Sequence, residues 1–467
     1  MAIRRLLCIQ LVAVLAVGTL AGVPSAHADD NLSLVLRAEW GDEPGPGQFQ
    51  NPSSVAVGPT GDVFVADSQS GDLFRFDSRG VFEDSWAVVG ITAVDIDSHG
   101  MVYALSGNTV AKFTSDGDLI TSWGGTGEDD GELFFPGGLA VDWVGENVYV
   151  ADIAGNSSNQ PGRMQRFFSD GTFVSSWGTE GGTPRGVEAD DFGNVFVTDD
   201  LLSSPNIERY SREGQLLGHW GVLGSGDGEV SAGADVETDR EGRVYVSSNG
   251  RLQRFSADGD FQRRWNDDFA EAVALSDSGR VYSTGQGDTV RMFSPAPPFS
   301  DVPPWVDESV GWLAWHDYVS GYQDGTFRAQ NAITRAEKAR MLYRIAGEPD
   351  VSELPDHGFT DVPVWVQDPV TWLKANGFMT GYDDGTFRAA EPITRGAEAR
   401  VLYRIAGEPD VSELPDHGFT DVPDWVQDPV TWLKANGFMT GYDDDTFRPT
   451  VPITRGAEAR VLYRVYG

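Results

Sequence analysis

The chain has 467 residues, a formal net charge of −37 at pH 7 and one cysteine, Cys8. Because lysine and arginine contacts to phosphate drive nucleic-acid binding, this acidic excess argues against nucleic acid, and it equally disfavours an anionic membrane surface. A single cysteine excludes an internal disulfide and a cysteine-based metal site, and the length allows two domains or more.

Residues 1–28 have the layout of a secretory signal peptide. A basic start is followed by an apolar run over residues 6–17 and by Ala-His-Ala at residues 26–28, the small-x-small pattern that a signal peptidase requires. The run is short for a membrane span, and no later stretch is apolar enough to cross a bilayer. We therefore predict a secreted protein that is not inserted in a membrane after signal cleavage.

Residues 29–294 carry a repeat marked by tryptophan. The tryptophans recur about every 45 residues, at Trp40, Trp86, Trp123, Trp177, Trp220 and Trp265. Between them the order is constant: a short strand, a glycine turn, an aromatic and β-branched strand, a strand ending in an aromatic residue, a second turn and a strand that leads into the next tryptophan. Four short strands per repeat are typical of β-propeller blades.

The two ends of this region predict how the ring closes. The sixth repeat lacks a fourth strand, because the chain passes from Phe293 directly into Ser-Pro-Ala-Pro-Pro. Residues 34–40, LVLRAEW, match the missing strand. We predict that this N-terminal strand completes the sixth blade and removes the edge that a linear array would expose. The fold class is mainly β plus α, with a six-bladed β-propeller closed by its N-terminal strand and a helical module after it.

The blades resemble NHL repeats, most clearly where residues 47–52, GQFQNP, lead into residues 63–67, VFVAD. The resemblance implies the fold and leaves the function open, since propellers of this type include scaffolds, ligand binders and some lyases or lactonases. The enzymatic relatives usually work through a metal in the central channel. With only two histidines, His99 and His219, this region cannot build a three-histidine zinc site.

Three aspartates end the second strands of their repeats, namely Asp67, Asp152 and Asp199. Matching positions would place them on a common rim, where three carboxylates could bind calcium. The other interpretation, which we favour, is that each aspartate caps a turn of its own repeat. The sequence predicts no other cofactor and no catalytic residue, since it has no Gly-x-Ser-x-Gly, phosphate-loop or His-Glu-x-x-His motif.

The C-terminal region consists of a proline-rich linker and three similar units joined by two identical linkers: 295–298, 299–347, 348–358, 359–407, 408–418 and 419–467. In each unit, apolar residues at helical spacing predict two helices separated by a glycine and aspartate turn. A repeat of this length over three units indicates a stacked-repeat module rather than a catalytic domain.

The second helix of each unit begins at an Ile-Thr-Arg sequence. In the first unit, Thr334 and Glu337 have the spacing of a capping box, in which the hydroxyl accepts one backbone N–H and the carboxylate reaches back to the cap. We favour this role for Glu337 over a ligand contact. In the second unit the carboxylate lies one residue further on, at Glu398, so the later caps should be weaker.

The motifs FTDVP, WV, GYDDGTFR and ITR, in this order before an apolar helix, resemble the S-layer homology (SLH) domain. Three SLH units commonly form one pseudo-threefold module that holds a bacterial surface protein on cell-wall polysaccharide, often a pyruvylated polymer. The resemblance implies that the Thr-Arg pairs lie in the grooves between units that take the sugar. The candidate polysaccharide-binding residues are therefore Thr334, Arg335, Thr394, Arg395, Thr454 and Arg455.

A guanidinium suits the carboxylate of a pyruvyl ketal, because its fork matches that group with two hydrogen bonds. Three tryptophans in the first helices could support the sugar face, although their helical positions favour core packing: Trp312, Trp372 and Trp432. Only the first unit has the full Thr-Arg-Ala-Glu motif, and Asp445 replaces the turn glycine in the third. We therefore expect unequal occupancy of the grooves.

The predicted protein is secreted and resides on the cell wall or cell surface. Its SLH module binds an anionic polysaccharide, and its propeller presents an interaction surface to an unknown ligand or protein. One alternative makes the propeller a metal-dependent enzyme of lyase or lactonase type that uses the Asp67, Asp152 and Asp199 rim. Another makes the protein a structural S-layer component that assembles into sheets by itself.

Overall fold

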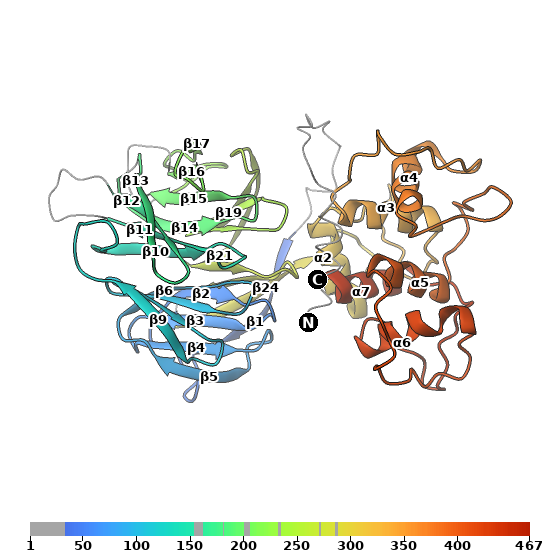
Figure 1. The fold of residues 1–467 in the computed structure, drawn as a ribbon, viewed down its shortest axis with the longest axis horizontal. Helices are drawn as coiled ribbons and strands as arrows, with labels where there is room; N and C mark the ends of the chain where they lie inside the picture. Colours follow the sequence, from blue (N-terminus) through green and yellow to red (C-terminus); the bar gives the residue numbers. More distant parts are fainter. Residues whose placement is uncertain are drawn as a thin grey trace. The chain divides into compact units, whose positions relative to one another are not determined.

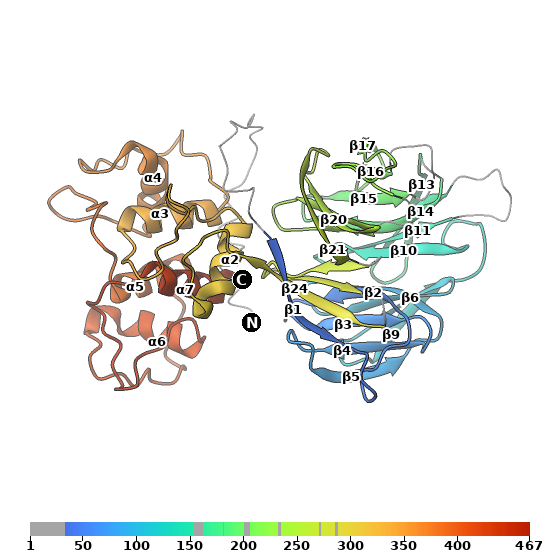
Figure 2. The ribbon, with the colours of Figure 1, turned by 180° about the vertical axis from the view of Figure 1, so that it is seen from behind.

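The computed structural model describes residues 33–153, 162–180, 182–199, 206–231, 235–269, 272–284 and 288–467. The predicted signal peptide lies outside these ranges. The described residues fall into two compact units, which meet in the chain between Ser294 and Pro295, one of them built of strands and the other mainly of helices (Figures 1 and 2). In the part of the chain that the structure covers, no helix is long and apolar enough to cross a membrane.

The first unit contains six antiparallel sheets of four strands each. The strands are β1 (Ser33–Trp40), β2 (Pro52–Val57), β3 (Val63–Asp67), β4 (Asp72–Phe76), β5 (Phe82–Ala87), β6 (Ile91–Ile96), β7 (Val102–Ser106), β8 (Thr109–Phe113), β9 (Leu119–Gly124), β10 (Pro136–Val141), β11 (Asn147–Asp152), β12 (Arg163–Phe168), β13 (Phe173–Gly178), β14 (Pro184–Ala189), β15 (Asn194–Asp199), β16 (Ile207–Ser211), β17 (Leu216–Trp220), β18 (Asp235–Thr238), β19 (Val244–Ser248), β20 (Gly250–Phe255), β21 (Phe261–Phe269), β22 (Val273–Leu275), β23 (Val281–Thr284) and β24 (Val290–Ala296).

The sixth sheet confirms the predicted closure of the ring. Its strand order is β1-β24-β23-β22, so β1, the first strand among the described residues, completes the last blade. Two contacts join β1 to its partner: the Arg37 Nε donates to the Ser294 hydroxyl at 2.7 Å, and Arg291 pairs with Glu39 at 2.9 Å. β24 ends at Ala296, so the last strand extends into the predicted linker at residues 295–298.

Five of the six tryptophans of the repeat lie against a glycine of the next blade. Trp86 lies near the end of the outer strand β5 and against Gly117, in the turn between β8 and β9, where an added Cβ would meet the indole at 2.8 Å. The ring of Trp86 also contacts Phe64 of its own blade and Phe113 of the next, at centroid distances of 6.2 Å. The same glycine contact recurs for Trp40 with Gly80, Trp123 with Gly171, Trp177 with Gly214 and Trp220 with Gly259.

The second compact unit, from Pro295 to Gly467, is mainly helical. Its elements are η2 (Pro304–Val306), α2 (Asp307–Trp315), α3 (Arg335–Ile345), η3 (Val364–Val366), α4 (Gln367–Ala375), α5 (Arg395–Ile405), η4 (Asp424–Val426), α6 (Gln427–Ala435) and α7 (Arg455–Tyr466). The first helix of each repeat packs on the second helix of the preceding repeat, as the pairs α3 with α4, α5 with α6 and α7 with α2 show. The last repeat therefore closes on the first.

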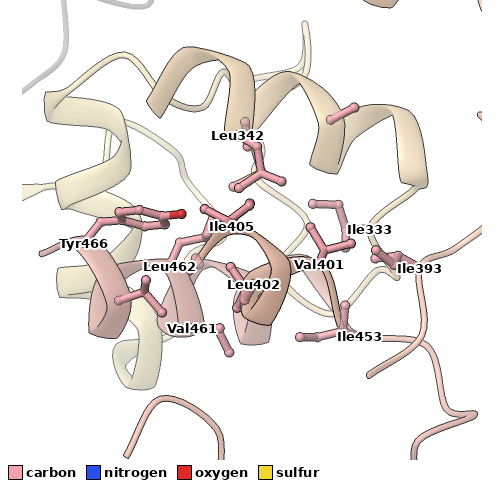
Figure 3. Close-up of a cluster of buried hydrophobic side chains, with 14 of the residues drawn as sticks. Ile333, Leu342, Ile393, Val401, Leu402, Ile405, Ile453, Val461, Leu462 and Tyr466 are labelled. Carbon is pink, nitrogen blue, oxygen red and sulfur yellow. The ribbon is translucent and has the colours of Figure 1, made fainter. Parts of the chain in front are cut away.

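A ring of three backbone hydrogen bonds marks the centre of this module. Ile333 N–H donates to the Ile453 carbonyl, Ile453 to Ile393, and Ile393 back to Ile333, each at 3.0 Å. Their side chains belong to the same buried cluster as Leu342 and Leu402 (Figure 3). The repeats thus share one core around a pseudo-threefold axis, which confirms the predicted three-unit helical module.

Three charged residues at equivalent positions of α3, α5 and α7 lie inside this core. The Lys338 ammonium lies 2.7 Å from a Glu398 carboxylate oxygen and also bonds Glu458, and all three side chains are fully buried. Burial, and next the like charge of Glu458, raise the pKa of Glu398 to about 7, while Lys338 opposes the shift. One ammonium therefore bridges two carboxyl groups in a dry interior.

Candidate functional site

The Ile-Thr-Arg sequences place a threonine at the N-cap of α3, α5 and α7. Each hydroxyl accepts the backbone N–H three residues further on, from Glu337, Ala397 and Ala457. In α3 the Glu337 carboxylate also bonds the Thr334 backbone N–H at 2.8 Å, which confirms the predicted capping box. The threonine hydroxyls hold the helix starts, and through them they fix the direction of the arginines that follow.

Each arginine of these motifs reaches across to the next repeat of the ring. The Nε of Arg335 donates to the carbonyl of Phe387 at 2.8 Å, and its guanidinium lies 5.1 Å from the Tyr382 ring centre. The other two arginines make the same contacts: Arg395 with Phe447 at 2.8 Å and Tyr442 at 5.0 Å, and Arg455 with Phe327 at 2.9 Å and Tyr322 at 5.0 Å. The structure therefore brings every candidate arginine to a boundary between two repeats.

The three guanidinium groups differ in their charge environment. Arg455 lies 2.6 Å from a Glu337 carboxylate oxygen. Among the described residues, neither Arg335 nor Arg395 forms an ion pair, and burial lowers the pKa of both. An arginine stays charged through such a shift, so two of the boundaries hold a desolvated cation without a counter-ion.

Two hollows lie along these boundaries. The larger, of about 1030 Å³, is lined by residues of the first two repeats, among them Thr334, Glu337 and Arg388. The smaller, of about 290 Å³, includes Arg455 and Glu337 in its lining. Trp365 contributes to both. These hollows are open rather than enclosed, which suits a polymer that passes over the surface.

The tryptophans named in the sequence analysis lie elsewhere. Trp312, Trp372 and Trp432 are only 2, 5 and 0 % exposed and belong to the core of the module. The prediction that these tryptophans could support a sugar is therefore wrong, because they are buried and no ring face reaches the surface. The core role, which the sequence analysis favoured, agrees with their burial.

Sequence reasoning missed a second set of tryptophans, one before each first helix: Trp305, Trp365 and Trp425, which are 45, 48 and 48 % exposed. Trp365 lies beside α3, where Arg340 donates to its carbonyl at 3.1 Å. Each follows an Asp-Val-Pro motif in the sequence, and in the structure each lies in the short 3-10 turn before the first helix rather than within that helix.

The aspartates of the propeller do not form a common site. Asp67, Asp152 and Asp199 are at most 1 % exposed, and each accepts hydrogen bonds from its own blade. Asp67 accepts the backbone N–H of Ser70 at 2.9 Å, and Asp152 pairs with Arg163 at 3.0 Å. No group of three or more side chains suited to a metal occurs among the described residues. The three aspartates do not fit a shared calcium ion.

Acidic side chains instead join neighbouring blades along their innermost strands. Asp95 on β6 accepts the backbone N–H of Val141 at 2.7 Å, and Asp235 on β18 accepts that of Val273 at 3.0 Å. Desolvation raises the pKa of Asp95 to about 7 and that of Asp235 to about 6. These carboxylates accept hydrogen bonds from backbone N–H groups of the neighbouring blade. No local sequence motif predicts this role.

The S-layer homology domain model matches residues 298–339, 358–397 and 418–457. A cellulosome-anchoring protein of Acetivibrio thermocellus is 29 % identical over 175 residues, which cover 36 % of this chain and 38 % of that protein. The chain thus spans little more than a third of that relative.

Two further proteins match about half of this chain each. NHL repeat-containing protein 3 of Mus musculus is 27 % identical over 245 residues, covering 47 % of this chain and 69 % of that protein. A solved gluconolactonase from Xanthomonas campestris has a TM-score of 0.44 at 15 % identity, over 53 % of this chain and 87 % of its own. The chain is a cell-surface protein that carries three S-layer homology domains after a six-bladed, NHL-like β-propeller.

Proposed function

We propose that the SLH module anchors the protein by binding an anionic cell-wall polysaccharide, with its carboxylate groups held by arginines between the repeats. One observation carries the proposal: Arg335, Arg395 and Arg455 occupy equivalent boundary positions, each fixed by the same Nε bond to a carbonyl of the next repeat. A guanidinium held in this way is preorganised, so little side-chain entropy is lost when an anion binds. Carboxylates of pyruvyl ketals have the matching charge and shape.

The surroundings of the arginines predict how salt acts on binding. Acidic residues outnumber basic ones throughout residues 299–467, so the net negative charge of the module repels an anionic polymer. Salt screens exposed charges over roughly 10 Å at 0.1 M, while partly buried pairs are screened less. Moderate salt or divalent ions are therefore expected to strengthen binding to the polymer.

Co-sedimentation with purified cell-wall sacculi tests the anchor. The secreted chain is mixed with sacculi that bear a pyruvylated polymer, and in parallel with sacculi from which the polymer has been extracted. The variant Arg335→Ala/Arg395→Ala/Arg455→Ala is compared with Arg79→Ala/Arg185→Ala/Arg240→Ala, which removes the same charge from exposed propeller sites. Sedimentation should require the polymer and the module's arginines and should survive the control. Equal sedimentation of both triple variants would contradict the proposal.

For the propeller, the binding or scaffold role has more support than catalysis. The aspartates on which the enzymatic alternative depends are already used within their own blades. His219 lies on the outer strand β17, where it faces Glu180 at 3.1 Å. The alternative predicts lactone or uronate turnover that depends on an added divalent ion, so an assay of the secreted chain with and without the ion discriminates the two.

A further inference from the structure

The three boundaries between repeats can be compared position by position. Each is named by the repeats that it joins and is defined by an arginine, a tyrosine and the residue three places after an N-cap: groove 3/1 by Arg455, Tyr322 and Glu337; groove 1/2 by Arg335, Tyr382 and Ala397; groove 2/3 by Arg395, Tyr442 and Ala457. The backbone N–H of the last residue bonds the N-cap threonine at 3.2, 3.3 and 3.2 Å in turn. The side chains therefore start from equivalent points.

Only groove 3/1 carries a carboxylate at this point. One oxygen of Glu337 accepts the Thr334 backbone N–H at 2.8 Å and completes the cap. The other lies 2.6 Å from the Arg455 guanidinium and accepts the Tyr322 hydroxyl at 3.2 Å. The capping box thus aims the second oxygen at the groove, where it makes the contacts that the carboxylate of a bound ligand would make.

Grooves 1/2 and 2/3 have the same frame without the carboxylate. In the described part of the chain, the guanidinium of Arg335 has a single hydrogen-bond partner, the Phe387 carbonyl, and Arg395 has two carbonyl partners. Tyr382 and Tyr442 are 39 and 38 % exposed. With alanine at positions 397 and 457, these two grooves have no side-chain carboxylate at the place that Glu337 occupies in groove 3/1, and their arginines have no counter-ion among the described residues.

We propose that Glu337 is a built-in occupant of groove 3/1, so that the module binds two anionic groups, one in groove 1/2 and one in groove 2/3. The inference rests on the proposed anchoring function and adds which grooves carry it. A ligand entering groove 3/1 must displace a tethered carboxylate that is present at high effective concentration. If both stayed, two like charges would share one guanidinium. Removal of the Glu337 carboxylate should open the third groove.

Calorimetric titration of the secreted chain tests this assignment. The probe is a monosaccharide with one pyruvyl ketal, and the same sugar with its carboxyl group esterified is the control. The wild-type protein should bind two equivalents and Glu337→Ala three. The converse variant, Ala397→Glu, should bind one, because it places a carboxylate beside Arg335. This variant also completes a capping box with Thr394, so it keeps the experiment decisive if Glu337→Ala folds poorly.

The outcomes separate the two levels of the account. Three equivalents in the wild type, or an unchanged count in Ala397→Glu, would overturn the role of Glu337 and leave anion binding intact. No binding of the ketal by the wild type and by either variant would overturn the proposed function itself. Equal binding of the esterified sugar would show that the grooves recognise something other than the carboxylate, and would also overturn the proposal.

Discussion

Two tryptophans of the second repeat illustrate how neighbouring residues take opposite roles. Trp365 precedes α4, is 48 % exposed and lines both hollows, whereas Trp372 lies within α4 and is 5 % exposed. The ring of Trp372 packs between Tyr343 of the preceding repeat and Phe378 of its own, at centroid distances of 6.0 and 5.5 Å. The first can serve binding, and the second holds two repeats together.

Trp372→Ala should lower the free energy of unfolding of the module by about 3–5 kcal/mol, the usual cost of truncating a buried aromatic residue. Trp365→Ala should change it by about 0.5 kcal/mol or less, in the range of surface substitutions. Denaturant unfolding followed by helical circular dichroism measures both. Similar losses in the two variants would contradict the assignment of Trp372 to the core.

The contact between Gly117 and Trp86 gives a residue-level test of the propeller. Gly100 and Gly117 have φ values of 79° and 86°, so alanine is strained at both, but only at Gly117 would the new Cβ meet an indole, at 2.8 Å. Gly100→Ala should cost about 1–2 kcal/mol from backbone strain alone. Gly117→Ala should cost about 1–3 kcal/mol more from overpacking. Equal midpoints in denaturant would mean that the tryptophan contact does not join the blades.

At the scale of elements, α3, α5 and α7 meet at a buried charge cluster rather than at a purely apolar seam. Lys338 serves two carboxyl groups, one oxygen of each being without a partner among the described residues. Lys338→Met should therefore destabilise the module by about 3–5 kcal/mol, because it leaves the carboxyl groups without their cation. Thermal unfolding of the variant checks this, and a rise in midpoint would contradict it.

The same cluster predicts a pH dependence. The folded-state pKa of Glu398, about 7, lies above its ordinary value of 4.5, so between these values the folded chain binds a proton that the unfolded chain lacks. Stability from this group is complete below about pH 4.5 and falls as the pH rises to about 7, by roughly 3 kcal/mol. Glu398→Gln should flatten this slope in denaturant titrations from pH 4.5 to 8. An identical slope would place the titration elsewhere.

At the scale of the whole molecule, the described residues form a propeller and a helical module, and each of them closes into a ring of repeats. The sequence predicted those features of each ring that recur from repeat to repeat. The closure of the propeller was predictable because the sixth repeat lacks its fourth strand, and the N-terminal strand that contains Trp40 matches the missing strand. The positions of Arg335 and its two equivalents between the repeats were implied by the resemblance of the Ile-Thr-Arg motif and its neighbours to the SLH domain. Both predictions rest on short motifs that recur in every repeat, and the recurrence is what makes the motifs recognisable in the sequence.

What the sequence did not reveal depends on contacts between distant repeats. Arg455 and Glu337 meet only because the third repeat closes on the first. Lys338 gathers Glu398 and Glu458 only because three helices share an axis. The expected inequality of the grooves was attributed partly to Asp445, yet this residue keeps the turn with a φ of 57°, near the 77° of its counterpart Gly385. The carboxylate of Glu337 distinguishes groove 3/1 from the other two.

The affinity of the protein for purified wall polymer, before and after chemical removal of the polymer's pyruvyl ketals, tests the central claim most directly. A hydrogen bond to a charged group contributes about 1.5–3 kcal/mol, or roughly 10-fold to 100-fold in affinity. Removing the ketals should therefore weaken binding at least 10-fold, and the triple arginine variant should bind both polymers equally weakly. Undiminished affinity for the polymer without ketals would contradict carboxylate recognition between the repeats.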